Sequence, residues 1–312
     1  MHTHVKPFGI KPHFTRAGTT RSHGYHIEPV ITDLTTEIDK LRGGVFGADC
    51  ETVSRLREVA EDVFGDILPV RIVMHSLPGA LTNPLVKLMG MEAYYLAMLD
   101  APDAVHEAME TGTRIYEQYY DFLEEERLLL PTHDFSPVAQ ESFAFNDELP
   151  TDRVTRTTEC WGFLESQETT AVSPDMFGEF VFPYQQRLVD RFGLLSYGCC
   201  ERVDALWQNY LSTWPKLRKL SISPFNNESR IGEYLRGSRV VYYSKPRADF
   251  ITCDGPLNEE AITMDIKRIC EAASGCLFEI AQRNAGTIFN DYERGRHYVR
   301  LTKEAVDRYW HP

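Results

Sequence analysis

The sequence Gly193-Leu-Leu-Ser-Tyr-Gly-Cys-Cys-Glu201 carries the strongest local signal for the fold of this chain. Its apolar pair, Leu194 and Leu195, predicts a short buried strand, and a helix-like segment begins at Arg202. In α/β proteins, ligands and catalytic groups collect where parallel strands end and loops begin. The two adjacent thiols and the carboxylate at this strand end are therefore expected to bind a soft metal, to act as nucleophile or acid, or only to fill space.

The composition is that of an acidic globular protein. The chain has 312 residues, of which 43% are hydrophobic and 25% charged, and its formal net charge is −13. This length suffices for one large α/β domain. The negative charge and the lack of a basic stripe argue against nucleic-acid binding. No run approaches the roughly 18 consecutive apolar residues of a membrane span, so no membrane partner is expected.

The seven cysteines are an odd number and, apart from one adjacent pair, widely spread. The first residues, Met-His-Thr-His-Val-Lys-Pro, lack the apolar core of a signal peptide. We therefore expect a cytoplasmic protein with reduced thiols, since adjacent cysteines also make a strained disulfide. Gly43-Gly44 lacks the pattern that flanks a phosphate-binding loop, so no nucleotide cofactor is expected.

Residues 1–30 hold five of the ten histidines without a clear period. Residues 1–48 are therefore predicted to form a loosely ordered arm or one that packs across a partner subunit, with a metal-binding tail as the alternative. From residue 49 onward, apolar segments alternate with helical patterns. Seven strands are predicted: Leu68–His75, Leu128–Asp134, Cys160–Glu168, Leu194–Cys200, Leu217–Pro224, Arg239–Pro246 and Cys276–Gln282. The predicted helices are Cys50–Phe64, Gly90–Glu126 with a break at Ala101-Pro102, Ser173–Phe192, Val203–Thr213, Ser229–Leu235, Asn258–Ala273 and Asp291–Trp310.

Short strands that are each followed by a helix are typical of a parallel sheet with helices outside it. Eight such strands would close a barrel, and residues 135–159 or the arm could contain the missing one. No Gly-, Pro- or Ser-rich linker divides the chain, so residues 49–312 are predicted to form one domain. Ser173, Asp103 and Asp291 are predicted helix N-caps, because each precedes a helical pattern.

Two blocks resemble the uroporphyrinogen decarboxylase superfamily. His75-Ser-Leu-Pro-Gly-Ala-Leu-Thr82 is similar to a strand and turn of that superfamily, and Val172-Ser-Pro-Asp-Met-Phe-Gly-Glu-Phe-Val-Phe-Pro-Tyr-Gln-Gln-Arg-Leu188 closely matches one of its helices. The similarity covers roughly residues 50–310. It implies a single (β/α)8 TIM barrel, of the uroporphyrinogen decarboxylase and methionine synthase kind, with its site at the C-terminal mouth.

The departures from the superfamily indicate its methyltransferase branch. The decarboxylases carry Arg-Gln-Ala-Gly-Arg-Tyr near the N-terminus, whereas this chain has Arg16-Ala-Gly-Thr-Thr-Arg21. Zinc methyltransferases place His-x-Cys at a strand end, where this chain has Tyr197-Gly198-Cys199, and a further cysteine near the last strand, where it has Arg283. The chain therefore resembles a divergent "GCCE" subgroup. The resemblance implies a corrinoid carried on a separate protein, and a homodimer.

The carboxyl ends of the barrel strands share one mouth, so their polar residues are pooled as a candidate site. The expected catalytic residues are Glu168, Glu201, His75 and Tyr197, and the expected substrate-binding residues are Gln167, Lys245, Asp134, Ser223 and Arg283. Cys199 and Cys200 could bind Zn²⁺, with Glu201 or His75 completing the set. Because side chains alternate along a strand, one cysteine could instead be a small buried apolar residue.

The favoured hypothesis is a methyltransferase that moves a methyl group between a small methylated substrate and a corrinoid carrier or a thiol. A second hypothesis is decarboxylation of a carboxylated substrate, porphyrinogen-like or aromatic, with Lys245 and Arg283 binding the carboxylate. A third is a barrel that has lost its chemistry and serves as a binding subunit, which predicts a closed or apolar mouth.

Overall fold

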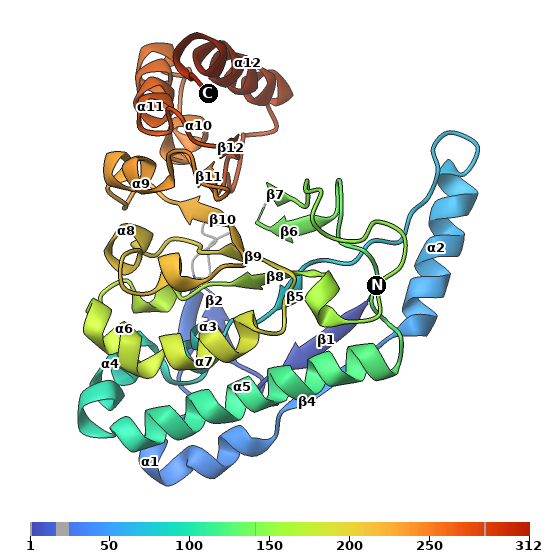
Figure 1. Cartoon of the computed structure of the whole chain (residues 1–312), viewed down its shortest axis with the longest axis vertical. Coiled ribbons are helices and arrows are strands. Elements are labelled where there is room, and N and C mark those ends of the chain that lie inside the picture. The colour runs from blue at the N-terminus through green and yellow to red at the C-terminus, as the bar shows by residue number, and fades with distance from the viewer. Residues whose placement is uncertain (1, 17–24, 141, 284) are drawn as a thin grey trace. The chain divides into compact units, whose positions relative to one another are not determined.

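The computed structural model describes residues 2–16, 25–140, 142–283 and 285–312. Its largest sheet has six strands in the order β12-β11-β10-β9-β8-β5 (Figure 1). Their bounds are β5 (Leu77–Pro78), β8 (Trp161–Leu164), β9 (Leu194–Tyr197), β10 (Leu217–Ile222), β11 (Val241–Ser244) and β12 (Phe278–Ile280). The pairs β5–β8, β10–β11 and β11–β12 are parallel, which confirms the predicted α/β class with a parallel sheet.

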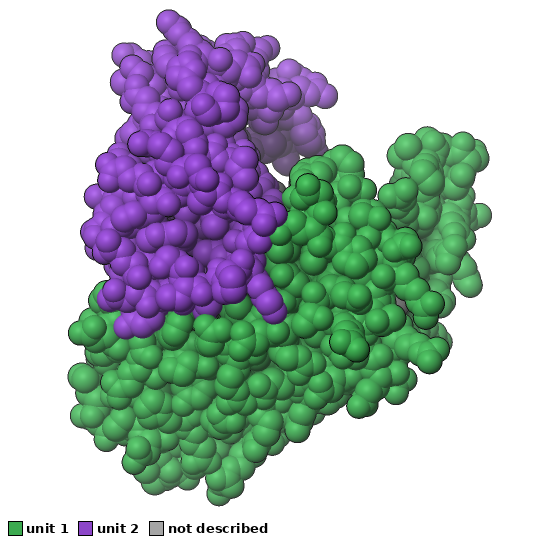
Figure 2. All heavy atoms as spheres, in the orientation of Figure 1, with its two compact units in different colours: residues 1–138, 143–195 green, residues 139–142, 196–312 purple. Residues whose placement is uncertain are grey.

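The chain divides into two compact units (Figure 2). The first comprises residues 1–138 and 143–195, and the second comprises residues 139–142 and 196–312. β6 (Pro137–Ala139) and β7 (Ser142–Phe143) stand where the chain passes from the first unit to the second and back. The boundary predicted at residue 48, between an arm and one domain, stays a prediction.

In the first unit, two tyrosines of a long helix form hydrogen bonds to the end of β5 and the segment that follows it. The helices of this unit are α1 (Leu34–Glu37), η1 (Ile38–Arg42), α2 (Cys50–Phe64), α3 (Thr82–Met89), α4 (Met91–Asp100), α5 (Pro102–Glu125), η2 (Thr157–Glu159), η3 (Gln167–Thr169), α6 (Pro174–Phe180) and α7 (Phe182–Val189). On α5, Tyr116 and Tyr120 are buried and donate to the carbonyls of Ala80 (3.0 Å) and Pro78 (2.6 Å). These bonds fix the segment that follows β5.

The N-terminal part of the first unit contains two small antiparallel sheets. β1 (Thr3–Lys6) pairs with β4 (Val45–Ala48), and β2 (His13–Arg16) pairs with β3 (Tyr25–Glu28). Part of the arm is therefore regular. Arg21 and His23 lie outside the described residues.

The second unit places helices beside strands β10 to β12. These helices are α8 (Val203–Leu206), η4 (Leu211–Thr213), α9 (Glu228–Leu235), α10 (Asp249–Thr252), α11 (Glu259–Ala272) and α12 (Tyr292–Tyr309), and α11 lies alongside α12 (Figure 1). The parallel register aligns Ser221, Tyr243 and Glu279 in one row across the three strands. Because side chains alternate, the neighbouring Tyr242 points to the opposite face, where its hydroxyl reaches the Glu228 carbonyl of α9 at 3.5 Å.

Most predicted elements are confirmed, including α2 with its bounds and the break between α4 and α5. Ser173 and Asp291 cap their helices by accepting from the backbone N–H three residues on. Asp103 is not a cap, because Ala101 holds that position and Pro102 begins the helix. The predicted strands Leu68–His75 and Leu128–Asp134 are wrong.

Both wrong predictions contain a proline, which removes a backbone donor from a ladder. Leu68, Ile72 and Val73 are exposed, and the strand that follows them, β5, has two residues. The eight-stranded closed barrel is not confirmed: within the described ranges the sheet has six strands, with β5 and β12 at its edges. In the same ranges, no helix is long and apolar enough to cross a membrane.

Candidate active site

The loop after β9 begins with a glycine that turns the chain. Gly198 has φ +102°, in the left-handed region that favours glycine, and a Cβ built there would lie 3.2 Å from the Cβ of Ser221. The turn ends the strand alternation that would have sent Cys199 and Cys200 to opposite faces. Their sulfurs instead lie 3.6 Å apart.

Side chains at the end of β10 and just after it bind the carbonyls of this loop. Three consecutive carbonyl oxygens accept hydrogen bonds from these side chains: that of Cys199 from Ser221 Oγ, that of Cys200 from Ser223 Oγ and that of Glu201 from Asn226 Nδ2, all at 3.2 Å. Asn226 Nδ2 also donates to Ser223 Oγ at 3.0 Å. The loop is therefore rigid, and Ser223 acts in part as one of its supports.

Glu201 supports the same loop from within. Its side chain is buried, and its carboxylate accepts the backbone N–H of Cys199 at 2.6 Å. A carboxylate that receives a backbone N–H two residues earlier closes a tight local turn. The geometry favours a positioning role for Glu201 over the predicted catalytic role.

The two thiols lie against a guanidinium group. Arg283 Nη1 donates to Cys199 Sγ at 2.9 Å and lies 3.9 Å from Cys200 Sγ. The hydrogen bond from Cys199 and the charges of Arg283 and Lys245 together lower the pKa of Cys200 to about 6. The same hydrogen bond and burial raise the pKa of Cys199. The two thiols therefore titrate as a pair, in which Cys200 is the thiol whose pKa is lowered.

Lys245 is the second cation of the cluster and follows β11 directly. It is buried, and its Nζ donates to Gln140 Oε1 at 2.8 Å and lies 3.4 Å from the Cys199 carbonyl. Burial lowers the pKa of Lys245 to about 8. Gln140 also donates from Nε2 to Cys199 Sγ at 3.4 Å, so one amide connects the lysine to the thiol.

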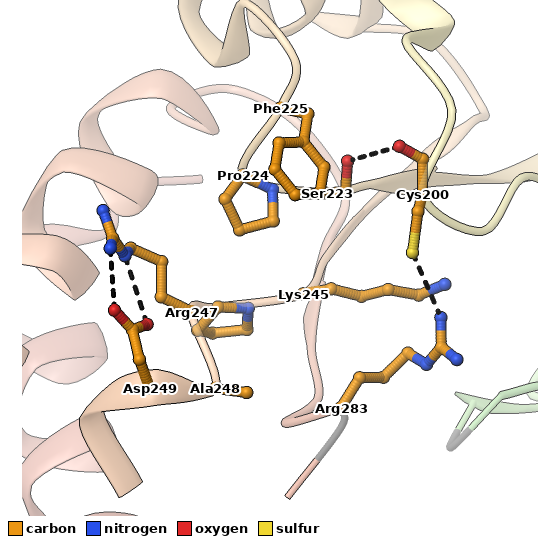
Figure 3. Close-up of a pocket in the computed structure, with 10 residues that line it drawn as sticks. Cys200, Ser223, Pro224, Phe225, Lys245, Arg247, Ala248, Asp249 and Arg283 are labelled. Atoms are coloured by element: carbon orange, nitrogen blue, oxygen red, sulfur yellow. Dashed lines mark hydrogen bonds and ion pairs between the residues drawn. The ribbon is translucent and has the colours of Figure 1, made fainter. Parts of the chain in front are cut away.

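A cavity of about 480 Å³ opens beside these groups, within the range of small-molecule sites. Its polar wall consists of Cys200, Ser223, Lys245, Arg247, Asp249 and Arg283, and its apolar wall includes Pro224, Phe225 and Pro246. Lys245 and Arg283 both extend toward the Cys200 sulfur, whereas Arg247 is bound to Asp249 at 2.7 and 3.2 Å (Figure 3). An anion entering the cavity meets more positive than negative charge.

An ion pair formed by a buried lysine lies in the same unit, on the face that carries Ser221. Lys219 Nζ is 2.6 Å from Glu279 Oε2 and 2.8 Å from Ser142 Oγ. Lys219 is not among the predicted site residues, because a lysine inside an apolar run suggests an exposed position. The spacing of two between Lys219, Ser221 and Ser223 indicates that these three polar side chains lie on one face of the strand. Gln140 was missed because it lies in an irregular segment.

Tyr197 is a core residue of this unit. It is fully buried, and its ring packs against Trp214 with the centroids 5.2 Å apart. The cavity wall is formed by other side chains. Its predicted catalytic role stays a prediction that this placement does not support.

The remaining predicted residues belong to the first unit. Glu168 is buried and accepts from Thr82 Oγ1 (2.8 Å) and Asn83 Nδ2 (2.6 Å), and Gln167 precedes it in η3. His75 is exposed. Asp134 is exposed with φ +49°, and its carboxylate meets His133 Nδ1 at 2.8 Å. Glu168, His75 and Asp134 therefore have different neighbours, and no hydrogen bond described above connects any two of them.

The thiol pair does not fit a tetrahedral zinc site. Among the described residues, no three His, Cys, Asp or Glu side chains lie together in a way that could hold a metal ion. Glu201 is bound to the backbone, and Arg283 already donates to Cys199 Sγ. A cation in hydrogen-bond contact with a sulfur opposes a second cation there. The groups that stabilise the thiolate are therefore protein cations.

Comparisons with known proteins show the fold. No protein-family model matches the chain, and no curated protein matches it in sequence. Among solved structures it is similar to a methyltransferase from Methanosarcina mazei, with a TM-score of 0.54 and 14% sequence identity. The similarity covers 97% of this chain and 76% of that protein. At this identity the likeness establishes a shared fold and leaves the chemistry to the site.

Proposed function

We propose that this protein is a methyltransferase that takes a methyl group from a small anionic substrate bound in the cavity beside Cys200. The observation that carries the proposal is the convergence of Lys245, Arg283 and a vicinal thiol pair on one wall of that cavity. The shared fold with a methyltransferase supports it. The acceptor is a thiol or, as the sequence resemblance implies, a corrinoid carried on a separate protein.

Arg283 and Lys245 would bind the negative group of the substrate. Arg283 is held by Cys199 and Lys245 by Gln140, so both cations are oriented before the substrate arrives. Phe225, whose ring is largely exposed, provides an apolar surface at the same cavity. The expected substrate therefore combines a carboxylate or similar anion with a small apolar body.

Lys245 would also supply a proton. When the methyl group leaves, the bond between the methyl carbon and the substrate heteroatom breaks, and its electron pair stays on the heteroatom. The heteroatom takes a proton from the Lys245 ammonium group, while a lone pair of the acceptor forms the new bond to carbon. A general acid works best with a pKa near the working pH, and burial brings the pKa of Lys245 to about 8.

In this reaction the thiol pair would orient Arg283 through the hydrogen bond to Cys199. The positive charge of Arg283 beside the sulfurs would also oppose the binding of a metal ion to them. Direct transfer is favoured over a methylated Cys200 intermediate, because a neutral thioether is a poor methyl donor. A reduced corrinoid, when bound, would supply a strongly nucleophilic cobalt as the acceptor.

The experiment replaces Lys245 by Met, with Lys267→Met on α11, a partly buried lysine outside the cavity lining, as the matched control. Transfer from methyl-labelled methoxybenzoate, which carries the expected carboxylate, to free reduced cobalamin or to a thiol is followed by mass spectrometry. Loss of a general acid lowers kcat by about 100-fold or more. The wild-type rate should fall as the pH rises through about 8, where Lys245 loses its proton, and the variant should lack this step. Equal rates and pH profiles for both variants would contradict the role of Lys245.

Decarboxylation is the second candidate, because three cations line the cavity: Lys245, Arg247 and Arg283. The same labelled methoxybenzoate distinguishes the two reactions. Release of CO₂ with the methyl group retained favours decarboxylation, and loss of the methyl group alone favours the first candidate. The open, polar cavity counts against a binding subunit with a closed mouth.

A further inference from the structure

The thiol of Cys200 reaches the cavity, yet it takes no step in the proposed transfer. Cys200 is partly exposed and lines the cavity wall, whereas Cys199 is 2% exposed and lies behind that wall. In Figure 3 the Cys200 sulfur points toward the side chains of Lys245 and Arg283. A small molecule that enters the cavity therefore meets the sulfur of Cys200 before that of Cys199.

The backbone holds the two sulfurs close together. They lie 3.6 Å apart, because Gly198 turns the chain and because Ser221 and Ser223 bind the carbonyls of Cys199 and Cys200. The bond of a disulfide is about 2.0 Å long, so the sulfurs need to approach by roughly 1.6 Å to be joined. The reduced loop thus already presents the two thiols to each other.

Two cations stabilise a thiolate at this position. Arg283 Nη1 lies 2.9 Å from Cys199 Sγ and 3.9 Å from Cys200 Sγ, and the buried Lys245 lines the same cavity. The hydrogen bond from Cys199 and these two charges lower the pKa of Cys200. Oxidation-sensitive cysteines combine an easily ionised thiol, access to the oxidant and a neighbouring thiol that resolves the oxidised form. Cys200 has all three properties.

We propose that Cys200 is a site of reversible oxidation by small hydroperoxides, and that Cys199 is the resolving thiol, which forms a disulfide with it. The inference uses the cavity and its cations but no step of the transfer reaction. It therefore holds whether or not the protein transfers a methyl group.

The first step is a two-electron oxidation of Cys200. Its thiolate attacks the terminal oxygen of the hydroperoxide, the O–O bond breaks, and the sulfur becomes a sulfenic acid. The other oxygen leaves with the electron pair of the broken bond, as an alkoxide or, from hydrogen peroxide, as hydroxide. It takes a proton from the Lys245 ammonium group, which lines the cavity and regains a proton from water.

In the second step Cys199 resolves the sulfenic acid. Cys199 loses its proton, its sulfur attacks the Cys200 sulfur, and the S–O bond breaks. The departing hydroxide takes that proton and becomes water. In the reduced pair, the hydrogen bond with Cys200 and burial raise the pKa of Cys199. The neutral sulfenic acid no longer opposes a second negative charge, and Arg283, 2.9 Å away, stabilises the Cys199 thiolate.

The resulting disulfide is readily reduced. Adjacent cysteines form a strained ring, and strained disulfides have the more oxidising potentials that are typical of labile, regulatory bonds. A dithiol restores both thiols by exchange and is itself oxidised to a disulfide. The oxidation is therefore reversible, and the pair returns to the reduced state expected in the absence of peroxide.

The experiment treats the reduced full-length chain with a molar excess of hydrogen peroxide at pH 7, blocks the remaining thiols with iodoacetamide and digests the protein with trypsin. Cleavage after Arg191 and Arg202 releases one peptide that contains Cys199 and Cys200 and no other cysteine. This peptide should be unalkylated and two hydrogen masses lighter than the reduced form. Dithiothreitol added before the blocking step should restore alkylation of both thiols. A peptide that stays fully alkylated, or that carries a sulfinic acid in place of the disulfide, would overturn the proposal.

Two cysteine variants assign the roles within the pair. Cys200→Ala should leave Cys199 reduced under the same treatment, because the Cys199 sulfur is buried. Cys199→Ala should stop at the sulfenic acid of Cys200, which dimedone traps. This variant is treated at about pH 9, since the loss of Cys199 raises the pKa of Cys200. Dimedone on Cys199 of the Cys200→Ala variant, or its absence from Cys200 of the other variant, contradicts the assigned order.

A third set of variants tests the cation. Arg283→Met should slow the oxidation of Cys200 at pH 7 at least about threefold, because less of the thiol is ionised, and Arg283→Lys should retain most of the wild-type rate. Arg230→Met on α9 is the matched control, since Arg230 binds the Tyr234 hydroxyl at 2.8 Å and lies outside the cavity lining. Circular dichroism verifies the fold of each variant. Equal oxidation rates in Arg283→Met and Arg230→Met would show that Arg283 does not activate the thiol.

Discussion

The chemistry of the candidate site depends on how Cys199 and Cys200 divide one proton. The buried thiol of Cys199 keeps it, because leaving a second negative charge 3.6 Å from the first is costly in a poorly solvated place. Arg283 and Lys245 favour the remaining thiolate on Cys200. At the residue scale, therefore, Cys200 combines the charge of a thiolate with access to the cavity.

The first prediction concerns the reactivity of Cys200 with iodoacetamide. With a pKa of about 6, this thiol is ~90% ionised at pH 7, against ~3% for an ordinary cysteine. Alkylation measured by peptide mass spectrometry should therefore show a midpoint near pH 6 at Cys200. In Cys199→Ala the midpoint should move up, because the hydrogen-bond donor is lost. A midpoint above pH 8 in the wild-type chain would show that the cations do not control this sulfur.

At the scale of elements, the site depends on a turn between β9 and α8. Gly198 begins the turn, and Ser221, Ser223 and Asn226 bind the carbonyls that follow it. Polar side chains on the end of β10 are thus used to hold a neighbouring loop. The turn brings both sulfurs together, which a continued strand would prevent.

The second prediction is that Gly198→Ala displaces this loop. A side chain at φ +102° is strained, and its Cβ would also crowd Ser221 at 3.2 Å. We expect a loss of stability of about 1–3 kcal/mol in urea denaturation, together with slower alkylation of Cys200 at pH 7. Gly237→Ala is the matched control, since Gly237 also has positive φ but no neighbour within 4 Å. If both variants alkylate Cys200 at the same rate, the turn does not position the sulfur.

The sequence predicted those elements whose signal is local. Strands β8 to β12 and helix α2 carry their apolar patterns within a few residues, and their positions are confirmed. Leu68–His75 has the composition of a strand, but Pro69 interrupts its ladder and its apolar residues are exposed. An apolar run alone does not say whether a partner strand is available.

At the scale of the whole molecule, the candidate site was predictable in its residue types and not in its contacts. Lys245, Cys200, Ser223 and Arg283 were expected at strand ends, and they line one cavity. That Arg283 would bind a sulfur 84 positions earlier is a property of the folded second unit. The zinc hypothesis was based on the two adjacent thiols alone. In the folded chain, the cations Arg283 and Lys245 lie beside these thiols.

The most direct test of the account is the metal content of the purified protein, because the central claim is that Arg283 and Lys245, and not a metal, hold the thiol pair. Elemental analysis by mass spectrometry after dialysis should find well below one zinc per chain, with the same content in the Cys199→Ala, Cys200→Ala double variant. One zinc per wild-type chain that is lost in the double variant would contradict the claim.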